Sequence, residues 1–197
     1  MNILKFHSQG VSVEALHLPE ELLLDLEQNL MLFFTGSSRN SAEILEGQDR
    51  SIEHGENGVL EALTSLKGLV PLMRDALRAG DLDSFGRLLD KSWAIKKRVS
   101  SKISTSQIDR IYEVAKQCGA LGGKITGAGG GGFLLLYCER EKQPRLREVL
   151  KEFGLKEMIF HFDMAGTRVV YNDPFFDSDT RGGIRWVLST TLDGLKA

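Results

Sequence analysis

The sequence predicts a helix-rich α+β fold whose strands can pair in an antiparallel sheet. Short apolar runs at residues 31–34 and 133–137 have the length and the aromatic content of buried strands. Longer segments between them place leucines at helical spacing, so that one face of each helix is apolar. Strand–helix–strand units with returns that allow antiparallel pairing are typical of the α+β class.

The first part of the chain is expected to contain short strands and one helix. Residues 3–6 and 11–13 indicate two strands, and Pro19 marks a helix start, because proline is favoured in the first helical turn. The apolar strand at 31–34 ends in a loop of small residues. A second helix is expected to begin near Ser41.

Four further helices and two closing strands are expected in the remainder of the chain. The helices are predicted over 60–77, 82–98, 106–118 and 144–153, and the strands over 158–162 and 167–171. Pro71 is expected to interrupt the first of these helices, and Gly80 and Gly119 are expected to end the first and the third. The tail from Asn172 breaks the pattern and is interpreted as a linker.

The composition is that of a globular protein, and it argues against several function classes. With 197 residues and 42% hydrophobic side chains, the chain can bury a core. A net charge of −2 offers no electrostatic basis for binding nucleic acid or a membrane surface, and no apolar run reaches the roughly 20 residues of a membrane span. The N-terminus lacks a signal-peptide pattern, so we expect a cytoplasmic protein. Neither the histidines nor the cysteines have metal-site spacing (His7, His17, His54, His161, Cys118 and Cys138).

The most informative segment is a glycine-rich loop at 127–132, in which five of the six residues are glycine and an apolar strand follows directly. Ordering glycine costs about 0.5–1 kcal/mol relative to alanine in a regular element. Such a dense cluster therefore indicates backbone angles closed to other residues, or a close approach to a ligand. Because successive amides in such a turn can converge on an anion, phosphate is the first ligand to consider.

Two common phosphate-binding motifs do not fit this loop. Gly127, Gly129 and Gly132 match G-x-G-x-x-G, but that fingerprint needs a helix behind it, whereas residues 133–137 read as a strand. The chain also contains no G-x-x-x-x-G-K-[ST] sequence. The alternative is a glycine-rich connection that lets strands pass close to other backbone without binding any ligand.

Residues 124–133, Lys-Ile-Thr-Gly-Ala-Gly-Gly-Gly-Gly-Phe, resemble the third conserved motif of the galactokinase, homoserine kinase, mevalonate kinase and phosphomevalonate kinase (GHMP) superfamily. Further segments resemble its D-glycero-D-manno-heptose 7-phosphate kinase branch. These segments are 35–39, 42–45, Ser92-Trp93, Lys96-Lys97, 100–104, Ile108-Asp109, 119–124 and 166–171.

The resemblance implies a ferredoxin-like GHMP-kinase C-terminal domain with extra helices and an antiparallel sheet. It assigns 1–16 to strands from the end of an N-terminal kinase domain, 17–171 to the C-terminal domain, and 172–197 to a linker or tail. The family's Gly-Leu-Gly-Ser-Ser phosphate loop and its catalytic aspartate have no match in this chain. We therefore expect a truncated or split kinase, inactive alone, whose partner is the missing N-terminal half.

The implied reaction is phosphoryl transfer from ATP, with Mg²⁺, to the anomeric hydroxyl of a sugar phosphate. The implied residues on the ATP side are Thr126, Gly127, Ala128, Gly129, Gly130, Gly131 and Gly132. The expected contacts to the sugar phosphate are Gly36, Ser37, Arg39 and Lys124, and no catalytic or metal-binding residue is assigned. Arg39 suits bidentate phosphate binding, although a solvated arginine on an exposed turn is the alternative. Lys102 and Lys124 have the same alternative, as surface charges.

Two other functions stay open at this point. One is a different small-molecule kinase of the same superfamily, and the other is a ferredoxin-like module that binds an anion or a partner without catalysis. If the N-terminal half is missing, the strands at 3–6 and 11–13 leave unpaired edges and exposed apolar side chains. We therefore expect the chain to self-associate through these strands.

Overall fold

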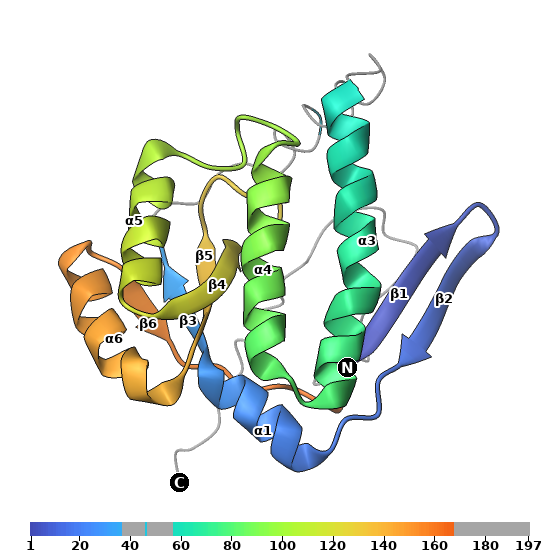
Figure 1. The fold of residues 1–197 in the computed structure, drawn as a ribbon, viewed down its shortest axis with the longest axis horizontal. Helices are drawn as coiled ribbons and strands as arrows, with labels where there is room; N and C mark the ends of the chain where they lie inside the picture. Colours follow the sequence, from blue (N-terminus) through green and yellow to red (C-terminus); the bar gives the residue numbers. More distant parts are fainter. Residues whose placement is uncertain (37–45, 47–56, 168–197) are drawn as a thin grey trace, which may run out of the picture. The chain divides into compact units, whose positions relative to one another are not determined.

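The computed structural model describes residues 1–36, 46 and 57–167 (Figure 1). Residues 1–162 form one compact unit, and a second unit begins at Asp163. The elements are β1 (Asn2–His7), β2 (Gly10–Ala15), α1 (Glu20–Asn29), β3 (Leu30–Phe34), α3 (Asn57–Ala79), α4 (Leu82–Lys97), α5 (Ser106–Gln117), β4 (Ala120–Ile125), β5 (Phe133–Cys138), η1 (Arg140–Lys142), α6 (Gln143–Glu152) and β6 (Lys156–Met158).

The central sheet has four strands in the order β4-β5-β3-β6, and each neighbouring pair is antiparallel. Strands β4 and β5 form a hairpin, whereas β3 lies between β5 and β6, which come much later in the chain. This is the ferredoxin-like arrangement, with α3, α4 and α5 inserted between β3 and β4 and with α6 between β5 and β6. The predicted α+β class and antiparallel sheet are confirmed.

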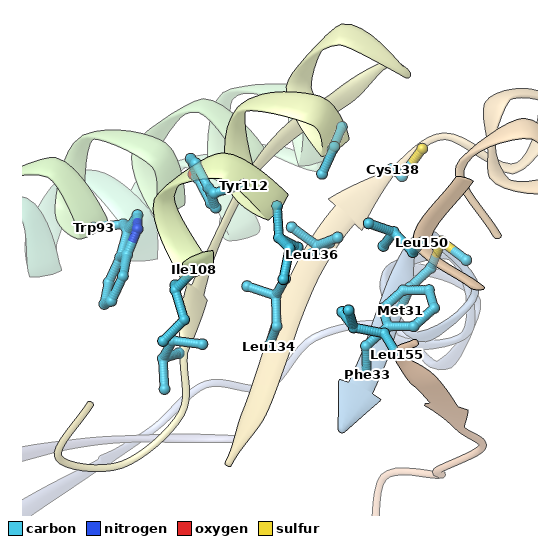
Figure 2. Packing of buried hydrophobic residues seen from close by; sticks show 14 of the residues in the cluster. Met31, Phe33, Trp93, Ile108, Tyr112, Leu134, Leu136, Cys138, Leu150 and Leu155 are labelled. Carbon is cyan, nitrogen blue, oxygen red and sulfur yellow. The ribbon is translucent and has the colours of Figure 1, made fainter. Parts of the chain in front are cut away.

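Buried side chains form two clusters, and β5 contributes to both through alternate residues. Leu134 and Leu136 of β5 belong to the first cluster with residues of α5 and α6, and Figure 2 shows this packing. Tyr137 points to the opposite face, as alternation along a strand requires, and joins the second cluster with Leu26 of α1 and Leu89 of α4. The first cluster is the larger one and also contains Trp93, whose side chain is 1% exposed.

Local signals in the sequence explain where several helices begin and end. The Asp81 side chain accepts a hydrogen bond from the Ser84 amide at 2.9 Å and caps α4. Thr105 caps α5 in the same way through the Ile108 amide. Gly80 follows α3 with a φ of +71°, which ends a helix at little cost for glycine.

Two details of the expected secondary structure are wrong. Pro71 lies inside the continuous helix α3 and does not interrupt it. The closing strand, expected over 158–162, is confined to Lys156–Met158. Beyond it the described residues pair with no strand, and the Phe162 amide instead donates a hydrogen bond to the Glu27 carboxylate of α1 at 2.6 Å. The helix expected to begin near Ser41 lies outside the described residues apart from Glu46, which is helical. The strand expected at 167–171 also lies outside them, apart from Thr167, which is not in a strand.

The two N-terminal strands form a separate antiparallel hairpin, as predicted. Leu4 lies opposite Val13 and Phe6 lies opposite Val11. These four side chains share one face of the hairpin and are 53–77% exposed. The other face points inward, where Ile3 packs against the second cluster. The hairpin therefore presents an apolar surface that no described residue of this chain covers.

Candidate functional site: a glycine-rich hairpin loop

The glycine-rich loop is the connection between β4 and β5. The ladder of the hairpin runs to the pair Ile125–Leu134, and the Thr126 amide then donates to the Phe133 carbonyl at 2.8 Å. Residues 127–132 therefore project from the end of a rigid hairpin. The strand that follows the loop confirms that this is not a dinucleotide fingerprint, because no helix opens behind the glycines.

The backbone of the loop explains why it is almost entirely glycine. Gly127, Gly129, Gly130, Gly131 and Gly132 have φ values of +76°, +111°, +75°, +151° and +88°. Side chains with a Cβ are strained in this region of φ, whereas glycine adopts it freely. The composition is thus a requirement of the turn itself, whether or not the loop also holds a ligand.

Three neighbouring segments hold the loop in place. The Gly130 amide donates to the Ile103 carbonyl in the connection between α4 and α5, at 2.7 Å. The Lys96 ammonium, near the end of α4, donates to the Gly127 carbonyl at 2.6 Å. At the end of β3, the Thr35 amide and hydroxyl both donate to the Gly132 carbonyl, at 2.9 and 3.0 Å. The loop is therefore fixed at several points along its length.

The loop contains both a tightly packed and an open position. A Cβ built on Gly129 would lie 2.8 Å from the Ile103 carbonyl oxygen, so the backbone at this point passes directly over the α4–α5 connection. A Cβ on Gly127 would meet no atom within 4 Å, and Gly127 is exposed. The loop thus has a side anchored to the protein and a side open to a ligand.

Two lysines, Lys96 and Lys124, place positive charge near the open side of the loop. Burial and the nearby charge of Lys124 lower the pKa of Lys96 below the ordinary lysine value. Lys124 lies on β4, opposite Leu135 of β5. The neighbouring Lys97, in contrast, has an acidic partner: its ammonium contacts the Asp109 carboxylate at 2.9 Å.

A polar cluster behind β4 supports the hairpin. The Tyr112 hydroxyl donates to an Asp90 carboxylate oxygen at 2.7 Å, and Lys116 contacts the other oxygen at 2.8 Å. Lys116 also donates to the Leu121 carbonyl of β4. Burial and the Asp90 carboxylate raise the pKa of Tyr112, so the phenol stays protonated. A Cβ on Gly122 would collide with the Gly86 carbonyl oxygen, so α4 packs directly on the β4 backbone.

The structure describes most of the predicted site residues, and those that it describes lie in the loop or next to it. Residues 126–132 form the loop, and the Thr126 hydroxyl contacts the Phe133 carbonyl at 3.3 Å, as a residue at a strand end does. Gly36 is adjacent to Thr35, which contacts the loop. Lys124 lies two residues before Thr126 on β4. Ser37 and Arg39 lie outside the described residues.

Sequence reasoning missed Lys96, Ile103 and the Tyr112 cluster as parts of the site. Lys96 enters the sequence analysis only within a segment that resembles the family, with no role of its own. No local sequence signal could have found these parts of the site, because their contacts depend on how closely α4 packs against Gly122 of β4. The Asp109 carboxylate contacts the Lys97 ammonium and accepts a hydrogen bond from the Ser104 hydroxyl, both at 2.9 Å.

Among residues 1–36, 46 and 57–167, no three or more histidine, cysteine, aspartate or glutamate side chains come together as metal ligands. Within the same residues, no helix has both the length and the apolar character needed to cross a membrane.

Residues 73–156 match the family described as GHMP kinases C terminal. The chain is 31% identical over 168 residues to the D-glycero-alpha-D-manno-heptose 7-phosphate kinase of Campylobacter jejuni, covering 85% of this chain and 49% of that relative. The chain thus spans about half the length of this relative.

Two solved structures share the fold. One is mevalonate kinase of L. major in complex with R-mevalonate, with a TM-score of 0.65 and 17% identity over 77% of this chain and 44% of that chain. The other is a D-glycero-D-manno-heptose 1-phosphate kinase from Bacteroides thetaiotaomicron, with a TM-score of 0.56 and 23% identity over 82% of this chain and 42% of that chain.

Proposed function

We propose that this chain provides the C-terminal half of an ATP-dependent kinase for a sugar phosphate, because residues 73–156 match the family described as GHMP kinases C terminal. The acceptor that we propose is D-glycero-D-manno-heptose 7-phosphate, phosphorylated at its anomeric hydroxyl. The match to the Campylobacter jejuni heptose 7-phosphate kinase supports this acceptor, because it covers 85% of this chain, whereas a match to a mevalonate kinase at 36% identity covers 38%.

The observation that carries the proposal is the anchored glycine loop. Phosphoryl transfer needs little covalent chemistry from the protein, and positioning with electrostatic stabilisation accounts for most of the catalysis. A loop fixed by Lys96, Ile103 and Thr35, with an open side at Gly127, is preorganised for such a role. The backbone can approach phosphate oxygens closely there, because no side chain stands in the way.

Within this proposal, residues 126–132 face the phosphates of ATP, and Gly36 and Lys124 belong to the sugar-phosphate side, with Ser37 and Arg39. ATP brings the transferable phosphoryl group, and Mg²⁺ neutralises charge on its phosphates when bound. We assign none of the ligands of that metal to a residue of this chain. A kinase that draws on the ATP pool fits a cytoplasmic location, which we propose here.

We further propose that the β1–β2 hairpin, with residues 1–16, completes a sheet of the N-terminal kinase half, and that residues 17–171 act as the C-terminal domain with 172–197 as a tail. The exposed apolar face of the hairpin supports this assignment. Without the N-terminal half, the same face is available for pairing between copies of the chain.

A chimera tests the proposed substrate. The C-terminal half of the Campylobacter jejuni kinase is replaced by this chain, and ADP release from Mg-ATP is measured with heptose 7-phosphate, L-fucose and mevalonate. We expect turnover with heptose 7-phosphate only. Turnover with another acceptor alone assigns a different kinase of the superfamily. A folded chimera without turnover on any acceptor favours an anion-binding module without catalysis.

A further inference from the structure

We infer that Lys96 and Lys124 together form a phosphate-binding subsite beside Gly127. The inference rests on the proposed function and deepens it, because it names two ammonium groups that hold phosphate oxygens at the loop. The ligand class is a phosphate monoester or a polyphosphate. Its two sources in the proposed reaction are the nucleotide and the sugar phosphate.

The fold brings the two lysines to the same place from two elements. Lys124 and Gly122 are two residues apart on β4 and therefore share a face of the sheet. That face carries α4, because the Gly86 carbonyl and the Asp90 amide of α4 lie against Gly122. From Asp90 to Lys96 the helix advances about 9 Å. Lys96 therefore reaches the loop, where its ammonium donates to the Gly127 carbonyl.

The charge pattern distinguishes these two lysines from their neighbours. Lys97 and Lys116 each contact a carboxylate, at 2.9 and 2.8 Å. No carboxylate of the described residues forms an ion pair with Lys96 or Lys124. Burial, and after it the nearby charge of Lys124, lower the pKa of Lys96, because both disfavour the charged form of its ammonium. An anion bound between the two ammonium groups offsets their repulsion.

The remaining hydrogen-bonding capacity of Lys96 fits such an anion. An ammonium has three donors, and the Gly127 carbonyl takes one of them. The bond to the carbonyl also places the ammonium next to Gly127, and two of its donors remain for an anion. A phosphate bound there touches the exposed position at Gly127, where no side chain limits its approach.

Titration calorimetry of the full chain with inorganic tripolyphosphate, and separately with glucose 6-phosphate, tests the subsite. The variants are Lys96→Met and Lys124→Met, each of which keeps a long apolar side chain. Lys91→Met is the matched control, because Lys91 is an exposed lysine of the same helix. We expect each site variant to bind about tenfold more weakly or worse, as for the loss of a charged hydrogen bond, and the control to bind like the parent chain.

The choice of probe separates the two sources. A loss with tripolyphosphate alone assigns the subsite to the nucleotide, and a loss with the monoester alone assigns it to the sugar phosphate. Equal weakening in all three variants, or no binding by the parent chain, overturns the inference. If a methionine variant fails to fold, NMR titration of the Lys96 side chain in the parent decides: phosphate must raise its pKa, and an unchanged pKa overturns the inference.

Because binding is measured on the chain alone, its outcome is independent of turnover by the chimera. Binding without turnover would keep the subsite and reject the kinase role. Turnover without this binding would keep the kinase role and reject the subsite.

Discussion

Replacing Gly129 by alanine is expected to destabilise the chain through two separate effects. The φ of +111° is unfavourable for any residue with a Cβ and costs about 1–2 kcal/mol. The new Cβ also lies 2.8 Å from the Ile103 carbonyl oxygen and 3.0 Å from the Ile103 Cα, so backbone must move. Overpacking of this kind costs about 1–3 kcal/mol. The total is therefore roughly 2–5 kcal/mol.

Two control variants separate these effects. Gly127→Ala has the same kind of φ but no atom within 4 Å of the new Cβ, so it is expected to cost only about 1–2 kcal/mol. Gly68→Ala lies in the exposed interior of α3 with open space around it, and is expected to stabilise the chain by about 0.5–1 kcal/mol.

The assay is urea unfolding followed by circular dichroism, with the free energy of unfolding extrapolated to water for the parent and the three variants. The expected order of stability is Gly68→Ala, parent, Gly127→Ala and then Gly129→Ala. If Gly129→Ala is as stable as Gly127→Ala, the loop does not pack on Ile103, and the anchored geometry described above is wrong.

Three further predictions concern other parts of the molecule. Tyr112→Phe removes the hydroxyl that contacts Asp90 at 2.7 Å and should lower the free energy of unfolding in urea by about 1–2 kcal/mol; an unchanged value would show that the cluster does not support β4. Burial raises the pKa of the Cys138 thiol from 9.0 to about 11. The free energy of unfolding that is linked to this protonated thiol is thus fully present below pH 9 and lost as the pH rises through 11. Cys138→Ala should therefore make the free energy of unfolding fall less steeply between these pH values. An identical fall in both proteins would contradict the burial of the thiol. In sedimentation equilibrium the chain should self-associate at high concentration and the double variant Phe6→Glu, Val13→Lys should not; a monomeric parent would argue against the apolar hairpin face as a pairing surface.

Much of the fold follows from local sequence signals. The strands β1, β2, β3 and β5 and the helices α1, α4, α5 and α6 were predicted close to their bounds, because apolar spacing and capping residues act over a few positions. Tertiary contacts decided the exceptions. Pro71 is accommodated inside α3, and the hydrogen bond from the Phe162 amide to Glu27 holds the chain after Met158 away from the strand expected there.

The glycine loop was predictable as a site, but its supporting contacts were not. Five positive φ values leave a direct trace in the composition, because only glycine adopts them without strain. Lys96, in contrast, lies 31 residues before Gly127, and its contact with the loop depends on how closely α4 packs against Gly122 of β4. Nothing in the local pattern around Lys96 distinguishes it from Lys97, which has a carboxylate partner.

Reconstitution from two halves tests the central claim most directly. ADP release from Mg-ATP and heptose 7-phosphate is measured with this chain alone, with a separately produced N-terminal half of the Campylobacter jejuni relative alone, and with both together. The account predicts activity only in the mixture, and a lower rate when the chain carries Gly129→Ala than when it carries Gly68→Ala. Turnover by this chain alone, or a mixture no more active than the N-terminal half by itself, would contradict the proposal that the chain contributes the loop side of a shared kinase site.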